Sequence, residues 1–259
     1  MDFTTAEITG WVGRYGWLFM RLSGLMISAP FFSHRLIPVR IKIALTLALT
    51  IMMAPMVDTV PQVEPLSVMG LIISVNQVII GIAMGFLIGL GFSVIVMAGE
   101  NISFKMGLGF ATMADPQNGT SVPILSQFLL ILCTLMFLSI GGHVILLEIL
   151  VTSFKSLPIG VTGFSTEGMW KIITWGSAMF AASIILSLPV VVILTLVNLA
   201  LGVMTRAAPT LNIFSVGFPI SLLLGLVMVL YVLLPALSNQ MTAIWLELFS
   251  YLRHILGIA

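Results

Sequence analysis

Long runs without a charged residue constrain this chain more than any other feature. Only 7% of its 259 residues are charged, whereas soluble domains carry roughly a quarter. The charges leave five uninterrupted apolar runs, at residues 43–57, 65–99, 116–142, 172–205 and 207–246. A helix needs roughly 20 apolar residues to cross the roughly 30 Å hydrocarbon core of a bilayer. The sequence therefore predicts an integral membrane protein.

Several of these runs are longer than one membrane crossing requires. As a single helix with a rise of about 1.5 Å per residue, the 65–99 run would extend roughly 50 Å. Pro189, Pro219 and Pro235 lie inside the later runs, and each removes a backbone donor and so favours a kink or a break. With a sixth apolar segment near the start, we expect an all-α fold of about six apolar helices, several of them kinked or broken.

The sixth segment, residues 11–32, is unusual because it carries two arginines. Arg14 and Arg21 are seven residues apart, which places them on nearly the same side of a helix. An arginine at membrane depth is costly unless it meets a partner or water. We expect Arg21, the deeper of the two, to form a polar seam against another subunit or a water-filled lumen. The alternative is snorkelling toward the headgroups, which suits Arg14 better.

All the segments are expected to form one integral membrane domain over residues 1–259. Its end, residues 247–259, is predicted to be a short amphipathic tail, because apolar side chains recur there at helical spacing. These side chains are Leu248, Leu252, Ile255 and Leu256.

The segment at 99–121 has a composition that is unusual for a hydrophilic connector. It carries small and large apolar residues: Met106, Gly107, Leu108, Gly109, Phe110 and Met113. Methionine is flexible enough to seal irregular gaps, and glycine permits backbone shapes that other residues resist. We expect a plug-like loop that closes a cavity or a pore, with Gly107 and Gly109 as hinges. The alternative is a connector whose glycines only make turns.

Glycines in the second run predict a closely packed helix face. Gly81, Gly85 and Gly89 recur every four residues, and such faces drive helix association in lipid. The face serves either a subunit interface or packing within the chain, and the sequence does not separate these alternatives. Four polar residues are also expected at helix or subunit interfaces: Glu100, Lys105, His143 and Arg206.

Known catalytic and cofactor patterns are missing from the sequence. His143 and Glu148 are five residues apart, so on a helix they point about 140° from each other and do not form a metal pair. Neither a zinc spacing, nor a phosphate loop, nor a nucleophile elbow is present. With a net charge of +1, the chain lacks the basic patch that nucleic-acid binding requires. We expect no enzymatic activity, no cofactor, no metal and no nucleic-acid partner.

An ordered series of short segments resembles the family that contains flagellar FliR and the T component of injectisome export gates. The resemblance covers most of the chain, and its most telling late piece is Asn-Leu-Ala-Leu-Gly-Val-Met-Thr-Arg-Ala-Ala-Pro. The segments lie at residues 29–40, 77–86, 99–116, 142–143, 157–160, 198–209 and 217–219.

The resemblance implies an assembly and a place in the cell. One copy would join several copies of FliP and FliQ in a helical export gate, with FlhB nearby, in the bacterial inner membrane at the flagellar basal body. The helices would be kinked into hairpins, and unfolded export substrates would pass through the channel. The family's plug maps onto residues 106–115, with Phe110 at an aromatic plug position. The chain departs from the family at Lys105, Gly109 and Met113, where a glutamine, a serine and a second aromatic are common.

These considerations predict a non-enzymatic channel subunit of the flagellar type III protein export apparatus, in contact with lipid, whose 106–115 loop occludes the resting pore. Three alternatives stay open at this point. The chain could be the equivalent component of an injectisome, a secondary transporter for a small solute, or a scaffold whose loop only nucleates assembly. Broken helices and buried charges are used by transporters, but this chain has no obvious pair of equivalent halves.

Overall fold

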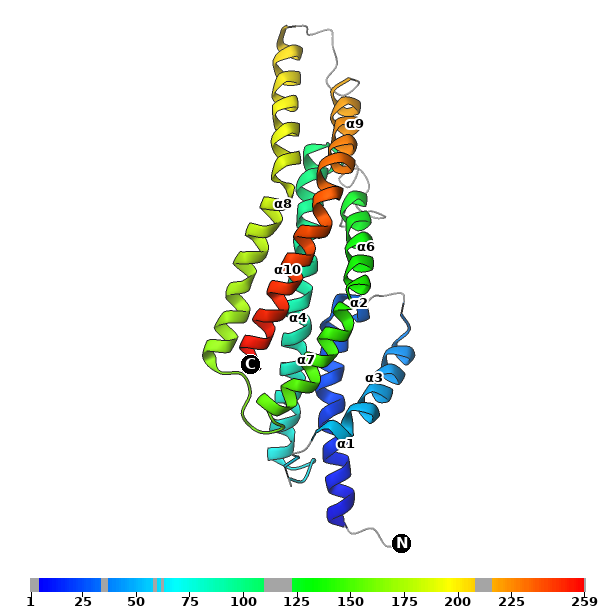
Figure 1. Cartoon of the computed structure of the whole chain (residues 1–259), viewed down its shortest axis with the longest axis vertical. Coiled ribbons are helices and arrows are strands. Elements are labelled where there is room, and N and C mark those ends of the chain that lie inside the picture. The colour runs from blue at the N-terminus through cyan, green and yellow to red at the C-terminus, as the bar shows by residue number, and fades with distance from the viewer. Residues whose placement is uncertain are drawn as a thin grey trace. The chain divides into compact units, whose positions relative to one another are not determined.

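The computed structural model describes residues 5–33, 37–57, 60–61, 63–109, 123–207 and 216–258. Helices account for most of these residues, and the described part contains no strand. The predicted all-α fold is therefore confirmed. The helices in chain order (Figure 1) are α1 (Thr5–Ser28), α2 (Pro30–Ser33), α3 (Val39–Met53), η1 (Ala54–Met56), α4 (Val68–Lys105), α6 (Ile124–Ser139), α7 (Gly142–Ser156), α8 (Thr166–Ala207), α9 (Phe218–Met228), η3 (Val229–Leu233) and α10 (Leu234–Ile255).

Four helical stretches in the described part are long and apolar enough to cross a membrane. They are Val39–Met56, Val68–Lys105, Thr166–Ala207 and Phe218–Ile255. Counting α6 and α7 together as one broken span raises the number to five. The sixth expected segment is helical as α1, but it is not among these spans. A chain with four or five such helices is a multi-pass membrane protein.

The chain divides into two compact units, and each is described by itself. Unit 1 consists of Met1–Leu90, Gly141–Gly176 and Leu246–Ala259, and unit 2 consists of Gly91–Ile140 and Ser177–Trp245. That residues 1–259 act as a single membrane domain stays a prediction.

The three interior prolines have different consequences for the helices. Pro189 lies inside α8 without ending it. Pro219 is the second residue of α9, and its fixed φ is compatible with the first turn of a helix. Pro235 follows the π-helical segment η3 and lies in the first turn of α10. The wider π turn gives the helix a way to absorb the proline, so the apolar run continues through it.

Aromatic side chains form the centre of unit 2. The ring of Phe137 in α6 lies 5.3 Å from that of Phe92 in α4 and 5.4 Å from that of Trp245 in α10. All three side chains are buried. Such edge-to-face rings contribute more than their buried area alone. Unit 2 is therefore organised around α4, with α6 and α10 packed against it.

The expected tail at 247–259 is the continuation of a longer helix. α10 runs without interruption to Ile255, so these residues do not begin a separate segment. Leu248, Leu252 and Leu256 are buried, whereas Arg253 is exposed. The apolar side chains of this helix end are therefore buried, and the charged one is exposed, as an amphipathic pattern requires.

Candidate functional site

The candidate site in unit 2 begins where α4 ends, later than the sequence predicted. The plug-like loop was expected from Gly99, but residues 99–105 form the last turns of α4. Gly99 is a packing residue, because a methyl group added there would lie 2.7 Å from Ser126 Oγ of α6. Glu100 is half-buried and Lys105 is exposed. The described part of the loop is therefore only residues 106–109, and Phe110 and Met113 lie outside the described residues.

Gly107 ends α4 in a defined backbone arrangement. Its φ of +82° lies in the left-handed region, which glycine adopts without steric cost. The N–H of Gly107 donates to the carbonyl of Phe104 at 3.2 Å, and the N–H of Leu108 donates to that of Ser103 at 3.0 Å. This pair of bonds is the Schellman motif that closes many helices. Gly107, expected as a hinge, is thus a helix cap.

A side chain from α8 completes the cap. Asn198 Nδ2 donates a hydrogen bond to the backbone carbonyl of Lys105 at 3.0 Å. Asn198 Oδ1 in turn accepts a bond from Ser221 Oγ of α9 at 2.7 Å. A single amide therefore connects the end of α4 to both α8 and α9 within unit 2. Sequence reasoning missed it, although a lone asparagine inside an apolar run was a signal.

Met106 is buried in the interior of unit 2. Its exposed fraction is 0%, and its side chain lies against Gly225 of α9. A methyl group added at Gly225 would overlap Met106 Cγ and lie 2.7 Å from its Sδ. Gly109 is also buried, and a methyl group there would lie 2.6 Å from the Phe104 ring. The structure thus places the first predicted plug residue in a packed notch, with Leu108 half-buried after it.

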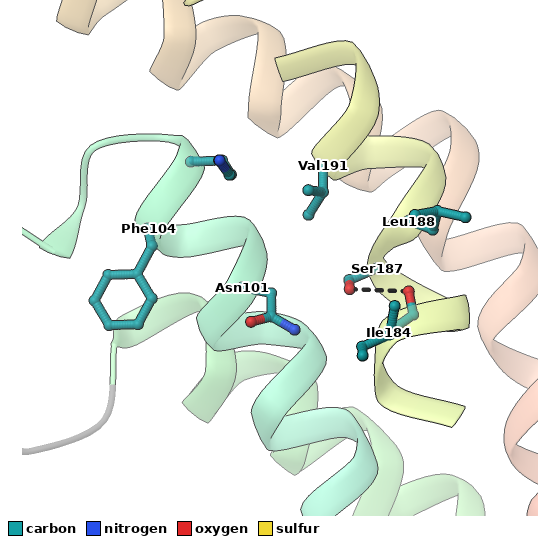
Figure 2. Close-up of a pocket in the computed structure, with 7 residues that line it drawn as sticks. Asn101, Phe104, Ile184, Ser187, Leu188 and Val191 are labelled. Atoms are coloured by element: carbon teal, nitrogen blue, oxygen red, sulfur yellow. Dashed lines mark hydrogen bonds between the residues drawn. The ribbon is translucent and has the colours of Figure 1, made fainter. Parts of the chain in front are cut away.

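A cavity of about 280 Å³ lies between the end of α4 and the middle of α8 (Figure 2). The residues that line it are Asn101, Phe104, Lys105, Ile184, Ser187, Leu188 and Val191. Ser187 Oγ is engaged by carbonyls of its own helix, that of Ser183 at 2.9 Å and that of Ile184 at 3.2 Å. Within the described ranges, no three His, Cys, Asp or Glu side chains gather into a metal-binding set.

In unit 1, the predicted glycine face lies between helices of this chain. α1 packs against Gly81 and Gly85 of α4 so closely that an added methyl group would overlap the Arg21 carbonyl oxygen and Ser28 Oγ, respectively. Gly24 of α1 approaches from the other side, because a methyl group there would lie 2.6 Å from the Val78 carbonyl oxygen. The sequence left open whether this face serves a subunit interface or packing within the chain. In the structure, Gly81 and Gly85 pack within the chain.

Arg21 is enclosed in unit 1. Its exposed fraction is 0%. Arg21 therefore neither faces a subunit or a lumen nor snorkels toward the headgroups, which were the two expectations. Its Nε donates to Gln77 Oε1 of α4 at 2.8 Å and one terminal nitrogen to Ser153 Oγ of α7 at 2.9 Å. The other terminal nitrogen donates to the Leu157 carbonyl at 2.9 Å, and the guanidinium lies 4.0 Å from the Phe154 ring centroid.

The remaining predicted interface residues lie near helix ends. His143 is in the first turn of α7, two residues after Gly141, whose φ is +72°. It is half-buried, and its Nδ1 has no hydrogen-bond partner in the described part of the chain. Glu148 pairs with Arg253 at 3.7 Å, and Arg206 is exposed in the last turn of α8. His143 and Glu148 therefore do not act as a pair.

Comparison with known proteins identifies relatives along almost the whole chain. The family described as bacterial export proteins, family 1, matches residues 12–248. A protein of Pectobacterium carotovorum subsp. carotovorum named flagellar biosynthetic protein FliR is 36% identical over 258 residues, which cover 99% of this chain and 97% of the relative. The protein of the same name from Escherichia coli (strain K12) is 34% identical, with 99% and 98% covered. The one from Bacillus subtilis (strain 168) is 29% identical, with 82% and 83% covered. The resemblance to FliR is thereby confirmed.

Proposed function

The chain belongs to family 1 of the bacterial export proteins, and from that premise we propose that it is a non-enzymatic channel subunit of the flagellar protein export apparatus. The observation that carries the proposal is similarity to proteins named FliR over 99% of the chain. Because the names of these relatives are flagellar, they favour the flagellar system over an injectisome.

The proposed partners are FliP and FliQ, which would form the export gate with this chain in the inner membrane of the flagellar basal body, with FlhB nearby. The distribution of burial supports a role as a subunit. In the most apolar stretch of α4, 56% of the residues are buried, whereas in that of α8 only 22% are buried. Surfaces such as that of α8 are free to meet lipid or other subunits, since a helix that is apolar all round needs an apolar environment on every side.

The proposed action is occlusion of the resting pore by the segment that follows Met106. Large apolar side chains exclude water and ions by dewetting a constriction. Once Met106 is packed against Gly225, the large apolar residues that remain in the segment are Phe110, Met113 and the half-buried Leu108. The capped end of α4 supports the proposal because it gives this segment a fixed starting point. Opening then requires the segment to yield to a substrate or to a movement of the partners.

Alanine at both Phe110 and Met113 is expected to raise the resting ion conductance of an assembled gate several-fold, because the seal loses most of its apolar volume. The measurement is conductance across planar bilayers that contain the complex purified with FliP and FliQ. Phe180→Ala, which truncates a phenylalanine that is 53% exposed on α8, is the matched control and should leave conductance unchanged.

Three outcomes would contradict parts of the proposal. Unchanged conductance in an intact complex of the double variant would exclude occlusion and favour a scaffold. Intact-mass measurement after coexpression with FliP and FliQ tests the partnership, and a stable species of this chain alone, without either partner, would exclude it. Solute uptake by the isolated chain in vesicles would instead indicate a secondary transporter.

A further inference from the structure

Among the described residues, one carbonyl at the end of α4 accepts from no backbone N–H of its own turn. The carbonyl of Ile102 accepts from the N–H of Met106 at 2.9 Å. Those of Ser103 and Phe104 accept from Leu108 and Gly107 within the cap. The carbonyl of Lys105 accepts from Asn198 instead. Because an unpaired carbonyl at a helix end needs a partner, the closing bond of this cap depends on another helix.

The Asn198 amide is held at one end by α4 and at the other by α9. Its two ends differ, since Nδ2 is a donor and Oδ1 is an acceptor. The Lys105 carbonyl can only accept, so it requires Nδ2 on its side, and Ser221 Oγ, from a residue that is 5% exposed, donates to Oδ1 at 2.7 Å and holds the other end of the amide. A flipped amide would place two oxygens against each other. Ser221 therefore acts on the end of α4 through Asn198.

A steric contact from α9 holds the next residue. Met106 occupies the notch that the missing side chain of Gly225 leaves, with its Sδ and Cε close to the glycine. Two consecutive residues are therefore held by neighbouring helices: Lys105 by Asn198 of α8 and Met106 by Gly225 of α9. A displacement of α9 from α4 would withdraw the Gly225 notch and the Ser221 hydroxyl together.

We infer that Asn198, Ser221 and Gly225 are positioning residues that form a latch on residues 105–106, so that movement of α9 releases the base of the proposed plug. The inference rests on the proposed function for its consequence, which is a closed resting pore. Its structural part stands on the described contacts alone. The latch lies entirely within unit 2.

The first test measures the latch without reference to a pore. Asn198→Asp keeps the shape of the side chain and replaces the donating nitrogen with oxygen. Hydrogen exchange at the amides of Met106, Gly107 and Leu108 should become several-fold faster in this variant, because the cap opens more often. Ser221→Ala should have a smaller effect in the same direction. Thr195→Val is the control, since that hydroxyl donates to the Val191 carbonyl of its own helix.

The second test separates the steric contact from general damage. Gly225→Ala and Met106→Ala should each raise exchange at Gly107 and the resting conductance of the assembled gate. In the double variant, the methyl group added at Gly225 fills part of the space that the Met106 side chain vacated. The two effects should therefore be far from independent, as expected for residues in direct contact. If the fold-changes of the two single variants simply multiply in the double variant, the two residues act independently and the inference is wrong.

Conductance then connects the latch to the plug. In assembled gates with FliP and FliQ, Asn198→Asp should raise resting conductance while substrate export continues, because the pore and the plug residues are intact. If Asn198→Asp has the same hydrogen-exchange rates and the same resting conductance as the native protein, the inference of a latch is wrong. If Asn198→Asp fails to assemble, the Met106 and Gly225 pair decides the question.

The two failures are distinguishable. The latch fails alone if Asn198→Asp stays closed while the Phe110 and Met113 double variant conducts. If exchange rises in Asn198→Asp but conductance is native in both variants, the contacts are real and the proposed occlusion is wrong.

Discussion

Alanine at Gly81 is expected to push α1 away from α4 and to lower the thermal stability of the folded protein markedly. The added methyl group would overlap the Arg21 carbonyl oxygen and lie 2.9 Å from the Leu25 nitrogen. Both are backbone atoms, so no rotamer change relieves the collision. Overpacking typically costs about 1–3 kcal/mol and occasionally more, and a backbone collision belongs at the upper end. The measurement is the midpoint of thermal loss of the monodisperse peak in size-exclusion chromatography, in a mild detergent.

Gly89→Ala is the matched control, because it makes the same change two turns further along the same helix. The added methyl group would lie 3.6 Å from Pro30 Cγ, which is ordinary contact. Since glycine in a helix is about 0.5–1 kcal/mol less favourable than alanine, this variant should be as stable as the native chain or slightly more so. Equal midpoints for Gly81→Ala and Gly89→Ala would show that the close approach of α1 to α4 is not as described.

The glycine pattern shows how far sequence periodicity extends. The four-residue repeat correctly indicated a closely packed face, because the spacing alone places Gly81 and Gly85 on one side of a helix. The identity of the opposing helix was not encoded locally. The approach of α1 depends on Gly24, which lies 57 residues earlier than Gly81.

The end of α4 shows where composition was misleading. The mixture of glycines and apolar residues suggested a loop from Gly99, yet helical structure continues to Lys105. Gly99 serves the contact with Ser126, and only Gly107 has the positive φ that ends the helix. A glycine that permits close packing and one that ends a helix look alike in a sequence. Asn198 was also missed, because its role depends on a contact with a residue 93 positions away.

Replacing Arg21 is expected to destabilise unit 1 strongly, whichever residue is introduced. Arg21→Met removes the charge, which recovers the cost of burying it, but leaves acceptors on Gln77, Ser153 and Leu157 without their donors. Each stranded buried group costs about 1–3 kcal/mol. Gln77 is fully buried, whereas Leu157 is half-buried and Ser153 keeps its bond to the Leu150 carbonyl, so we expect a net loss of about 1–3 kcal/mol. Arg14→Met, on the same helix at a half-buried position, is the control and should change the thermal midpoint little.

Lysine at position 21 separates the charge from the geometry. Its single ammonium keeps the buried charge but cannot span three acceptors that a planar guanidinium reaches with separate nitrogens. Arg21→Lys should therefore be no more stable than Arg21→Met. Native stability in the lysine variant would show that charge alone holds the junction.

Adding Gln77→Leu to Arg21→Met gives the sharpest comparison, because it removes one stranded acceptor together with the Gln77 Nε2 that already lacks a partner in the described chain. The double variant should then lose less than the sum of the two single losses, by about 1–3 kcal/mol. Additive losses would mean that Arg21 and Gln77 stabilise the unit independently. The hydrogen bond between them would then contribute little to the contact of α1 with α4.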